Sequence, residues 1–322
     1  MKLLFKSLFN YDELRATVLA YFIIVIKGIT FLAYELKDGD VTFYLQNIGT
    51  IPNHNPLTFG ILNTVYFFVK DKAFAFAIVE LVSYIALYLV VLISLNVVFC
   101  KEKYYYLSFF ILIYLPESIF YGSPLKEVLG LVLFFIFFSY FHKHKDTIKQ
   151  KLPFMFVLLF LNFMTHMVAF MFCLVLLISY FLLKNKKVAI GLTGFTFVFT
   201  LFFSVFKDFF RESFFYSFRK LEFVSHINVN TIANNIFLVG LKPIYIVFLL
   251  VYILFVVGIV FYYKKIDYVD IFVLIISTYF IFGATDWDYF ARFMSVIPFV
   301  LVFGLSSVVT KIYVKKNGEE VT

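Results

Sequence analysis

A lysine and a glutamate stand side by side at the start of an apolar segment, in the stretch YGSPLKEVLGLVLFF (121–135). A cation such as Lys126 is unfavourable beside the positive end of a helix dipole unless an anion also binds there. Backbone N–H groups, the dipole and an ammonium together form a site typical of phosphate binding. We therefore predict an anion site at Lys126, with Glu127 beside it as a candidate acid or base. A lysine that extends toward lipid headgroups is the alternative.

A second cation precedes the last apolar segment, in DWDYFARFMSVIPF (286–299). The planar guanidinium of Arg292 fits two phosphate oxygens at once, and Asp288 lies earlier in the same stretch. A surface ion pair near the membrane interface fits these residues as well. We treat Arg292 and Asp288 as candidate substrate-binding residues.

A histidine interrupts the apolar run 152–183, in the tetrapeptide MTHM (164–167). Ionisable side chains at membrane depth are rare and are functional candidates by default. An imidazole can take up or release a proton near neutral pH. His166 is therefore a candidate acid or base, although a ring satisfied by a backbone carbonyl is equally compatible with the sequence.

Two polar segments carry further charges. The stretch KDGDVTFY (37–44) contains a D-x-D pair, which is too weak a pattern to predict a metal site. We assign Asp40 instead as a base or as an acceptor for a sugar hydroxyl. The stretch KDFFRESFFYSFRKLEF (207–223) contains Arg211 and Arg219. Both could bind an acidic lipid headgroup, and solvated surface charges are the alternative.

These charges stand out because the rest of the chain is apolar. Of its 322 residues, 63% are hydrophobic and 15% are charged, which excludes an ordinary water-soluble domain. Apolar runs long enough to cross a bilayer recur between short polar breaks. We predict an all-α, polytopic membrane protein with one transmembrane domain over residues 1–322 and about ten spanning helices, at 16–34, 73–99, 104–120, 124–141, 152–165, 167–183, 188–206, 243–262, 269–285 and 292–311.

The polar segments between the apolar runs predict which loops of the protein face the cytoplasm and which face the outside. Short segments rich in Lys and Arg, such as HKHKDTIKQK (142–151) and KNKK (184–187), are typical of cytoplasmic loops. Both termini are then expected in the cytoplasm. Segment 56–69 is too short to span the membrane, and we expect it to form a re-entrant or interfacial helix. The extracytoplasmic loops are 35–55, 117–127, 207–242 and 285–292. The candidate residues therefore gather toward the outer face.

Two charges lie deep within predicted spans. Lys27 and Glu80 are each about 12 Å below the outer end of their helices, at a rise of about 1.5 Å per residue. An unpaired charge at that depth would cost several kcal/mol. We predict that Lys27 and Glu80 form an ion pair with a structural role.

The order of several short motifs resembles a known family. They are DVTFY, which contains Asp40 and Tyr44, then NPLTFGIL, SPLKE at an outer helix start, FLNFMTHMVAF with His166, and ARFMSVIPF, which opens the last helix with Arg292. This order, over nearly the whole chain, is similar to the EpsG-like branch of the Wzy-type polysaccharide polymerases. The family more often has Arg at the position of Lys126.

The resemblance implies an inverting glycosyltransferase in the bacterial cytoplasmic (inner) membrane, acting at its outer face. Its donor would be a glycan on undecaprenyl diphosphate and its acceptor a lipid-linked repeat unit. We expect neither metal nor other cofactor, because basic side chains replace Mg²⁺. Membrane lipids would surround such an enzyme. A chain-length regulator and a flippase are expected partners, and we expect no binding of nucleic acid. The residues expected to bind substrate are Tyr44, Lys126, Arg211, Arg219, Asp288 and Arg292, and the candidate catalytic residues are Asp40, Glu127 and His166.

Two other functions fit the sequence. A glycosyltransferase that uses a phosphopolyprenol monosaccharide as its donor would also place acidic residues in the first outer loop. A flippase or other transporter would instead place polar residues along a path through the membrane. The inner halves of the predicted helices are almost wholly apolar, which favours an enzyme over a transporter.

Overall fold

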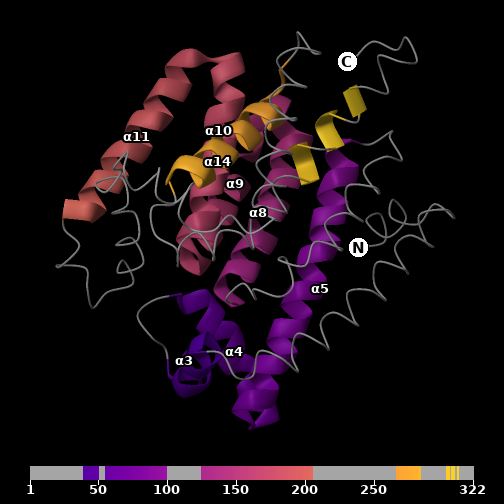
Figure 1. Cartoon of the computed structure of the whole chain (residues 1–322), viewed down its shortest axis with the longest axis vertical. Helices are drawn as coiled ribbons and strands as arrows, with labels where there is room; N and C mark the ends of the chain where they lie inside the picture. Colours follow the sequence, from indigo (N-terminus) through magenta and orange to yellow (C-terminus); the bar gives the residue numbers. More distant parts are fainter. Residues whose placement is uncertain are drawn as a thin grey trace, which may run out of the picture. The chain divides into compact units, whose positions relative to one another are not determined.

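The computed structural model describes residues 39–50, 55–99, 125–205 and 266–283, together with 302–304, 306–308, 310 and 311 near the C-terminus. This part of the chain is helical and contains no strand (Figure 1). By its internal contacts the chain divides into two compact units, Met1–Phe170 and Met171–Thr322. The elements are α3 (Gly39–Asn47), α4 (Pro56–Val69), α5 (Lys72–Val98), α8 (Leu125–His144), the 3₁₀ turn η1 (Lys145–Thr147), α9 (Ile148–Thr165), α10 (Met167–Lys184), α11 (Lys186–Val205) and α14 (Tyr268–Gly283).

Helix α8 lies at the centre of the first unit, where it packs against α5 and α9. Its phenylalanines are fully buried and fill the space between these helices, at positions 134, 135, 137, 138 and 141. Ser94 of α5 reaches across to α8, since its hydroxyl lies 2.6 Å from that of Ser139 and 3.0 Å from the carbonyl oxygen of Phe135. Such hydroxyl contacts hold helices together where the surroundings are apolar.

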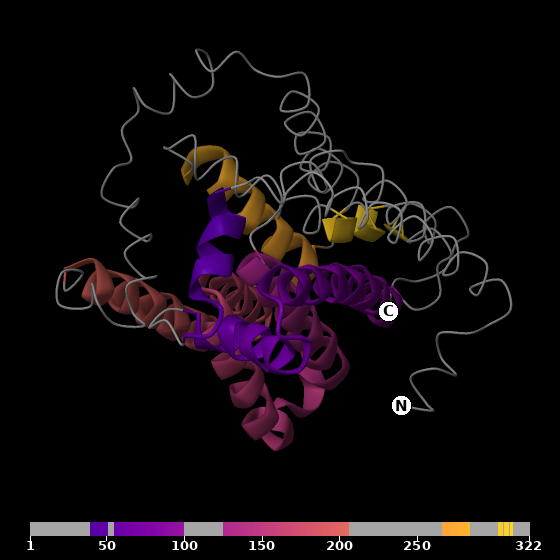
Figure 2. The same ribbon diagram turned by 90° about the horizontal axis from the view of Figure 1, so that it is seen from below.

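A small apolar core joins α3 and α4 to the first turns of α5 and α8. Val41, Tyr44 and Ile48 project from α3 and the residue after it, and they pack on Phe59 of α4 and Leu125 of α8. Figure 2 views the first unit from this end. The core places α3 and α4 at the N-terminal end of α8, which is the end that carries Lys126.

The chain between α3 and α4 is held by one side chain. Asn63 of α4 accepts a hydrogen bond from the backbone N–H of Gly49 at 2.8 Å and donates one to the carbonyl oxygen of Thr50 at 2.7 Å. Gly49 has a φ of +97°, which an L side chain rarely adopts. The turn therefore requires glycine at 49 and is anchored to α4 by Asn63.

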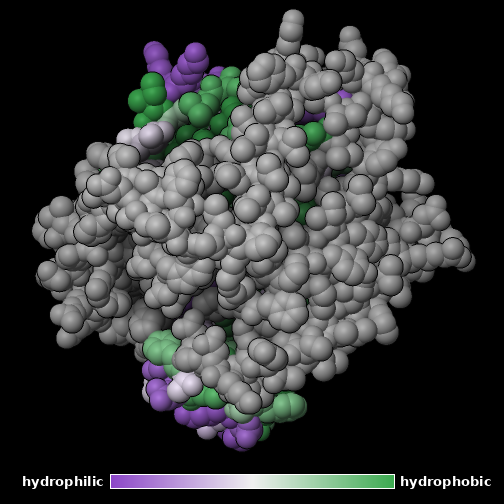
Figure 3. Space-filling model, viewed as in Figure 1, coloured by the Kyte–Doolittle hydropathy of each residue, from purple (hydrophilic) through white to green (hydrophobic). Residues whose placement is uncertain are grey.

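The turn from α4 to α5 joins charges to exposed aromatic side chains. Lys70 ends α4 in the left-handed region, and the carboxylate of Asp71 caps α5 by accepting a hydrogen bond from the N–H of Phe74 at 2.7 Å. Phe67, Phe68 and Phe74 are exposed around this turn. Hydrophilic and hydrophobic residues are both visible at the lower end of Figure 3. Aromatic rings beside charges are typical of a membrane interface.

Several predicted helices are confirmed as helices. Segments 56–69, 73–99 and 124–141 correspond to α4, α5 and α8 within a few residues, and 152–165, 167–183, 188–206 and 269–285 correspond to α9, α10, α11 and α14. Among the residues that the structure describes, two helical stretches are long and apolar enough to cross a membrane, namely Lys72–Val98 and Leu125–Thr165. Segments 16–34, 104–120 and 243–262 and the first part of 292–311 lie outside the described residues.

Apolar side chains are exposed on helices of both units. Phe154, Phe156 and Phe160 are exposed on α9 of the first unit. In the second unit, the turn from α10 to α11 carries exposed lysines beside exposed leucines, as the upper left of Figure 3 shows. Apolar faces of this kind favour a lipid environment over water.

Candidate functional site

The first turn of α8 is capped by a residue from α3. The hydroxyl of Tyr44 accepts a hydrogen bond from the backbone N–H of Lys126 at 3.2 Å. This N–H is one of those that a helix start leaves without an intrahelical partner. The Tyr44 ring is buried between Phe59 and Phe76, with ring centroids 5.6 and 5.5 Å away. Tyr44 thereby fixes the backbone that carries Lys126 and Glu127.

Glu127 lies opposite His166. The Oε1 atom of Glu127 is 4.0 Å from Nε2 of His166, and the two side chains are 8% and 13% exposed. This distance is longer than a hydrogen bond, but it is short enough for the carboxylate to stabilise a protonated imidazole. The two candidate acid and base residues therefore form one pair.

His166 separates α9 from α10. Its backbone is extended, with φ −159° and ψ 127°, and its N–H caps α9 by donating to the carbonyl oxygen of Asn162 at 2.9 Å. Its own carbonyl oxygen accepts from the N–H of Phe170 at 3.2 Å. The predicted break at MTHM is confirmed, and it places the His166 side chain beside α8.

The described site thus joins four of the predicted residues, Tyr44, Lys126, Glu127 and His166. Asp40 lies in the first turn of α3, so the segment 35–55, expected as a loop, contains a helix. The reason is that Val41, Tyr44 and Ile48 give α3 an apolar face. Arg211, Arg219, Asp288 and Arg292 lie outside the described residues.

The structure describes one residue of the predicted Lys27–Glu80 ion pair. Glu80 of α5 is buried at 3% exposure, and Lys27, its predicted partner, lies outside the described residues. Within the ranges that the structure describes, no cluster of three or more His, Cys, Asp or Glu side chains could hold a metal ion.

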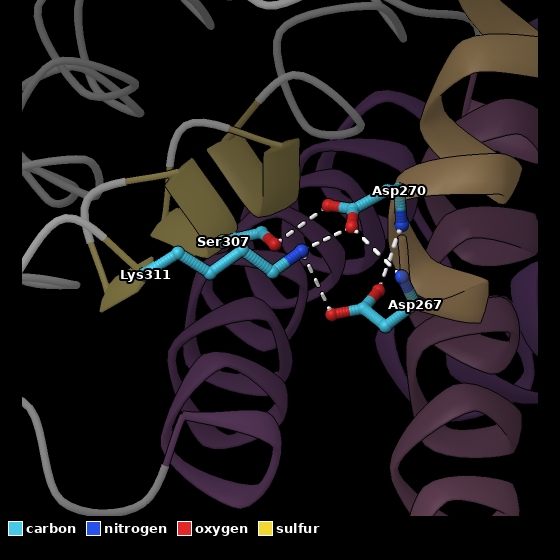
Figure 4. Close-up of polar contacts among 4 residues, drawn as sticks. All are labelled: Asp267, Asp270, Ser307 and Lys311. Carbon is cyan, nitrogen blue, oxygen red and sulfur yellow. Dashed lines mark hydrogen bonds and ion pairs between the residues drawn. The ribbon is translucent and has the colours of Figure 1, made fainter. Parts of the chain in front are cut away.

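An ionic network in the second unit, buried at Asp270 and Lys311 and open to solvent at Asp267, was not predicted from the sequence. Asp267 and Asp270 cap the start of α14 reciprocally, since the N–H of each donates to the carboxylate of the other at 3.0 Å. Ser307 donates to Asp270 at 2.7 Å, and Lys311 bridges Asp270 and Asp267, as Figure 4 shows. The sequence DYVD (267–270) resembles a capping box and could have revealed the cap. Lys311 is 41 positions from Asp270, and no local pattern links the two residues.

Removing Lys311 is expected to destabilise this network strongly. The Asp270 side chain is fully buried, and breaking a buried ion pair by removing one partner costs about 3–5 kcal/mol. Lys311→Met should therefore lower the thermal unfolding midpoint of the purified protein, and adding Asp270→Asn should restore part of the loss. Lys187→Met, at an exposed lysine of α11, is the matched control. Additive losses from Lys311→Met and Asp270→Asn would show that the pair does not stabilise the fold.

No protein-family model matches this chain, and neither a curated protein nor a solved structure matches it. Its function must therefore be inferred from its own residues.

Proposed function

We propose that this protein polymerises lipid-linked oligosaccharide repeat units, by inverting glycosyl transfer at the outer face of a bacterial cytoplasmic membrane. One observation carries the proposal. Tyr44 of α3 and His166 at the α9–α10 junction, which are far apart in the sequence, both meet the first turn of α8, Tyr44 at the backbone N–H of Lys126 and His166 opposite the carboxylate of Glu127. A cation, a carboxylate and an imidazole are the groups that such a transfer needs.

The cation acts on the leaving group. When the bond between the anomeric carbon of the donor and its phosphate oxygen breaks, the electron pair remains on the diphosphate. The ammonium of Lys126, at the positive end of α8, stabilises that charge. The backbone bond from Lys126 to Tyr44 holds this turn in place. Arg292, Arg219 and Arg211 are the further cations that we propose for the diphosphates, with Asp288 beside Arg292.

The Glu127–His166 pair acts on the acceptor. The imidazole of His166 takes the proton of the acceptor hydroxyl while the hydroxyl oxygen forms the new bond at the anomeric carbon, on the face opposite the departing diphosphate. Glu127, with Oε1 at 4.0 Å, stabilises the imidazolium until its proton passes to water. Asp40, in the first turn of α3, is the alternative base.

The donor distinguishes this function from the alternatives. Purified protein should convert undecaprenyl-diphosphate-linked repeat units into a ladder of longer products. Consumption of a phosphopolyprenol monosaccharide in place of the linked repeats would indicate the other class of glycosyltransferase. Movement of a lipid-linked sugar across vesicles with no new glycosidic bond would indicate a flippase.

The site must also lie on the outer side of the membrane. Helix α8 has 20 residues and is about 30 Å long, which matches the hydrocarbon core. In a chain without Cys100 and Cys173, a cysteine at Thr50 should react with an impermeant thiol reagent on intact cells. A cysteine at Asp146, which is exposed at the opposite end of α8, should react only after permeabilisation. The reverse pattern would place the site in the cytoplasm and contradict the proposal.

A further inference from the structure

Gly130 lies one helical turn beyond Glu127, where α8 meets the α9–α10 junction. A Cβ atom at Gly130 would lie 2.9 Å from Cβ of His166 and 3.0 Å from Cβ of Ala169. Contacts between carbon atoms are most favourable at about 3.5–4.0 Å. Only glycine allows the junction to approach α8 this closely.

We infer that Gly130 is a positioning residue that sets the separation of Glu127 and His166. This inference rests on the proposed function, in which the pair takes the proton of the acceptor hydroxyl. Gly130 itself offers no chemical group. Its missing side chain allows the His166 backbone to approach α8, and that approach brings Nε2 within 4.0 Å of the Glu127 carboxylate.

The contact cannot be relieved by rotating a side chain. Both neighbouring atoms are Cβ atoms, which are attached directly to the backbone. A methyl group at 130 must therefore move the α9–α10 junction or α8 by roughly 0.5–1 Å to reach an ordinary contact distance. The displacement acts directly on His166, which faces Glu127. It therefore changes the distance between the two side chains more than it changes the packing of the other helices.

The chain supplies a matched control. At Gly60, in α4 of the same unit, a Cβ atom would have no atom within 4 Å other than its chain neighbours and the backbone of its own helix. Gly60→Ala makes the same chemical change within a helix and creates no close contact. Ala169→Gly is the compensating change, because it removes one of the two atoms that a methyl group at 130 would meet.

The experiment compares Gly130→Ala, Gly60→Ala and the double variant Gly130→Ala/Ala169→Gly, each purified as the full chain. A misplacement of about 1 Å can lower a rate by up to about 100-fold. Gly130→Ala should therefore lower kcat for repeat-unit addition by about 10- to 100-fold with little change in the KM for the acceptor. Gly60→Ala should keep the wild-type kcat, and the double variant should recover part of the loss. The double variant also supplies the test if Gly130→Ala does not fold.

A wild-type kcat in Gly130→Ala would overturn the positioning role, provided that the wild-type protein makes polymer. A rise in KM without a fall in kcat would also overturn it, because a change in substrate binding would then explain the effect. Failure of the proposed function is recognised separately, since the wild-type protein itself would then form no polymer from lipid-linked repeats, and the inference would fall with it.

Discussion

Replacing Glu127 with glutamine, or His166 with glutamine, is expected to slow polymer formation by about 10²- to 10⁴-fold, the usual contribution of a general acid or base. Glutamine at 127 keeps the shape of the side chain and removes its charge, and glutamine at 166 removes the imidazole. Because the two side chains lie 4.0 Å apart and act as one unit, the double variant should be no slower than the slower single variant. The measurement is the rate of repeat-unit incorporation by purified protein.

A hydroxyl elsewhere in the chain provides the control. Ser179 is buried in α10, where it donates to the carbonyl oxygen of Val175 in its own helix at 2.7 Å. Ser179→Ala should leave the rate unchanged within about twofold, because one such bond within a helix contributes little to catalysis. Wild-type turnover in either Glu127→Gln or His166→Gln would show that the pair is not the acid or base.

Replacing Lys126 with alanine is expected to slow turnover by about 10- to 150-fold. A charge-assisted hydrogen bond contributes roughly 1.5–3 kcal/mol, and losing one that forms in the transition state raises the barrier by that amount. The fold should persist, because the hydrogen bond to Tyr44 is donated by the backbone N–H of residue 126, which alanine retains. Lys126→Arg should retain activity, since the charge is kept. We expect Arg292→Ala to give a loss of the same size.

Lys72 is the matched control for Lys126, because it also lies in the first turn of an apolar helix. Lys72→Ala should keep wild-type turnover. Cells with Lys126→Ala should display single repeat units and no ladder at a normal level of inserted protein. A normal ladder from that variant would leave Lys126 as an interfacial lysine without a role in catalysis.

Much of the helical pattern could be predicted because the apolar runs are long and their breaks are short. The bounds of α4 agree with the prediction, and the break at His166 could be predicted from Thr165 and His166 within an apolar run. Helix α3 could not be predicted from GDVTFYLQN, since its polar residues resemble a loop. Its apolar face becomes visible only when α4, α5 and α8 cover it.

The contacts that build the site are long-range and have no local signal. Nothing near Lys126 in the sequence indicates that Tyr44 caps its backbone, and nothing near Gly130 indicates that His166 lies against it. The same holds for Lys311, since the cap at Asp267 and Asp270 is local but its cation comes from near the C-terminus. The sequence could indicate which residues are chemically suited to a site. The residues that each of them contacts could be identified only from the folded structure.

The most direct test is the length of the products formed by purified protein from undecaprenyl-diphosphate-linked repeat units. The wild-type protein should give a ladder, and a variant that combines Lys126→Ala with Glu127→Gln should give unextended repeats only. Two results would contradict the account. Unextended repeats from the wild-type protein would reject the polymerase, and a full-length ladder from the double variant would reject the site at the N-terminal end of α8.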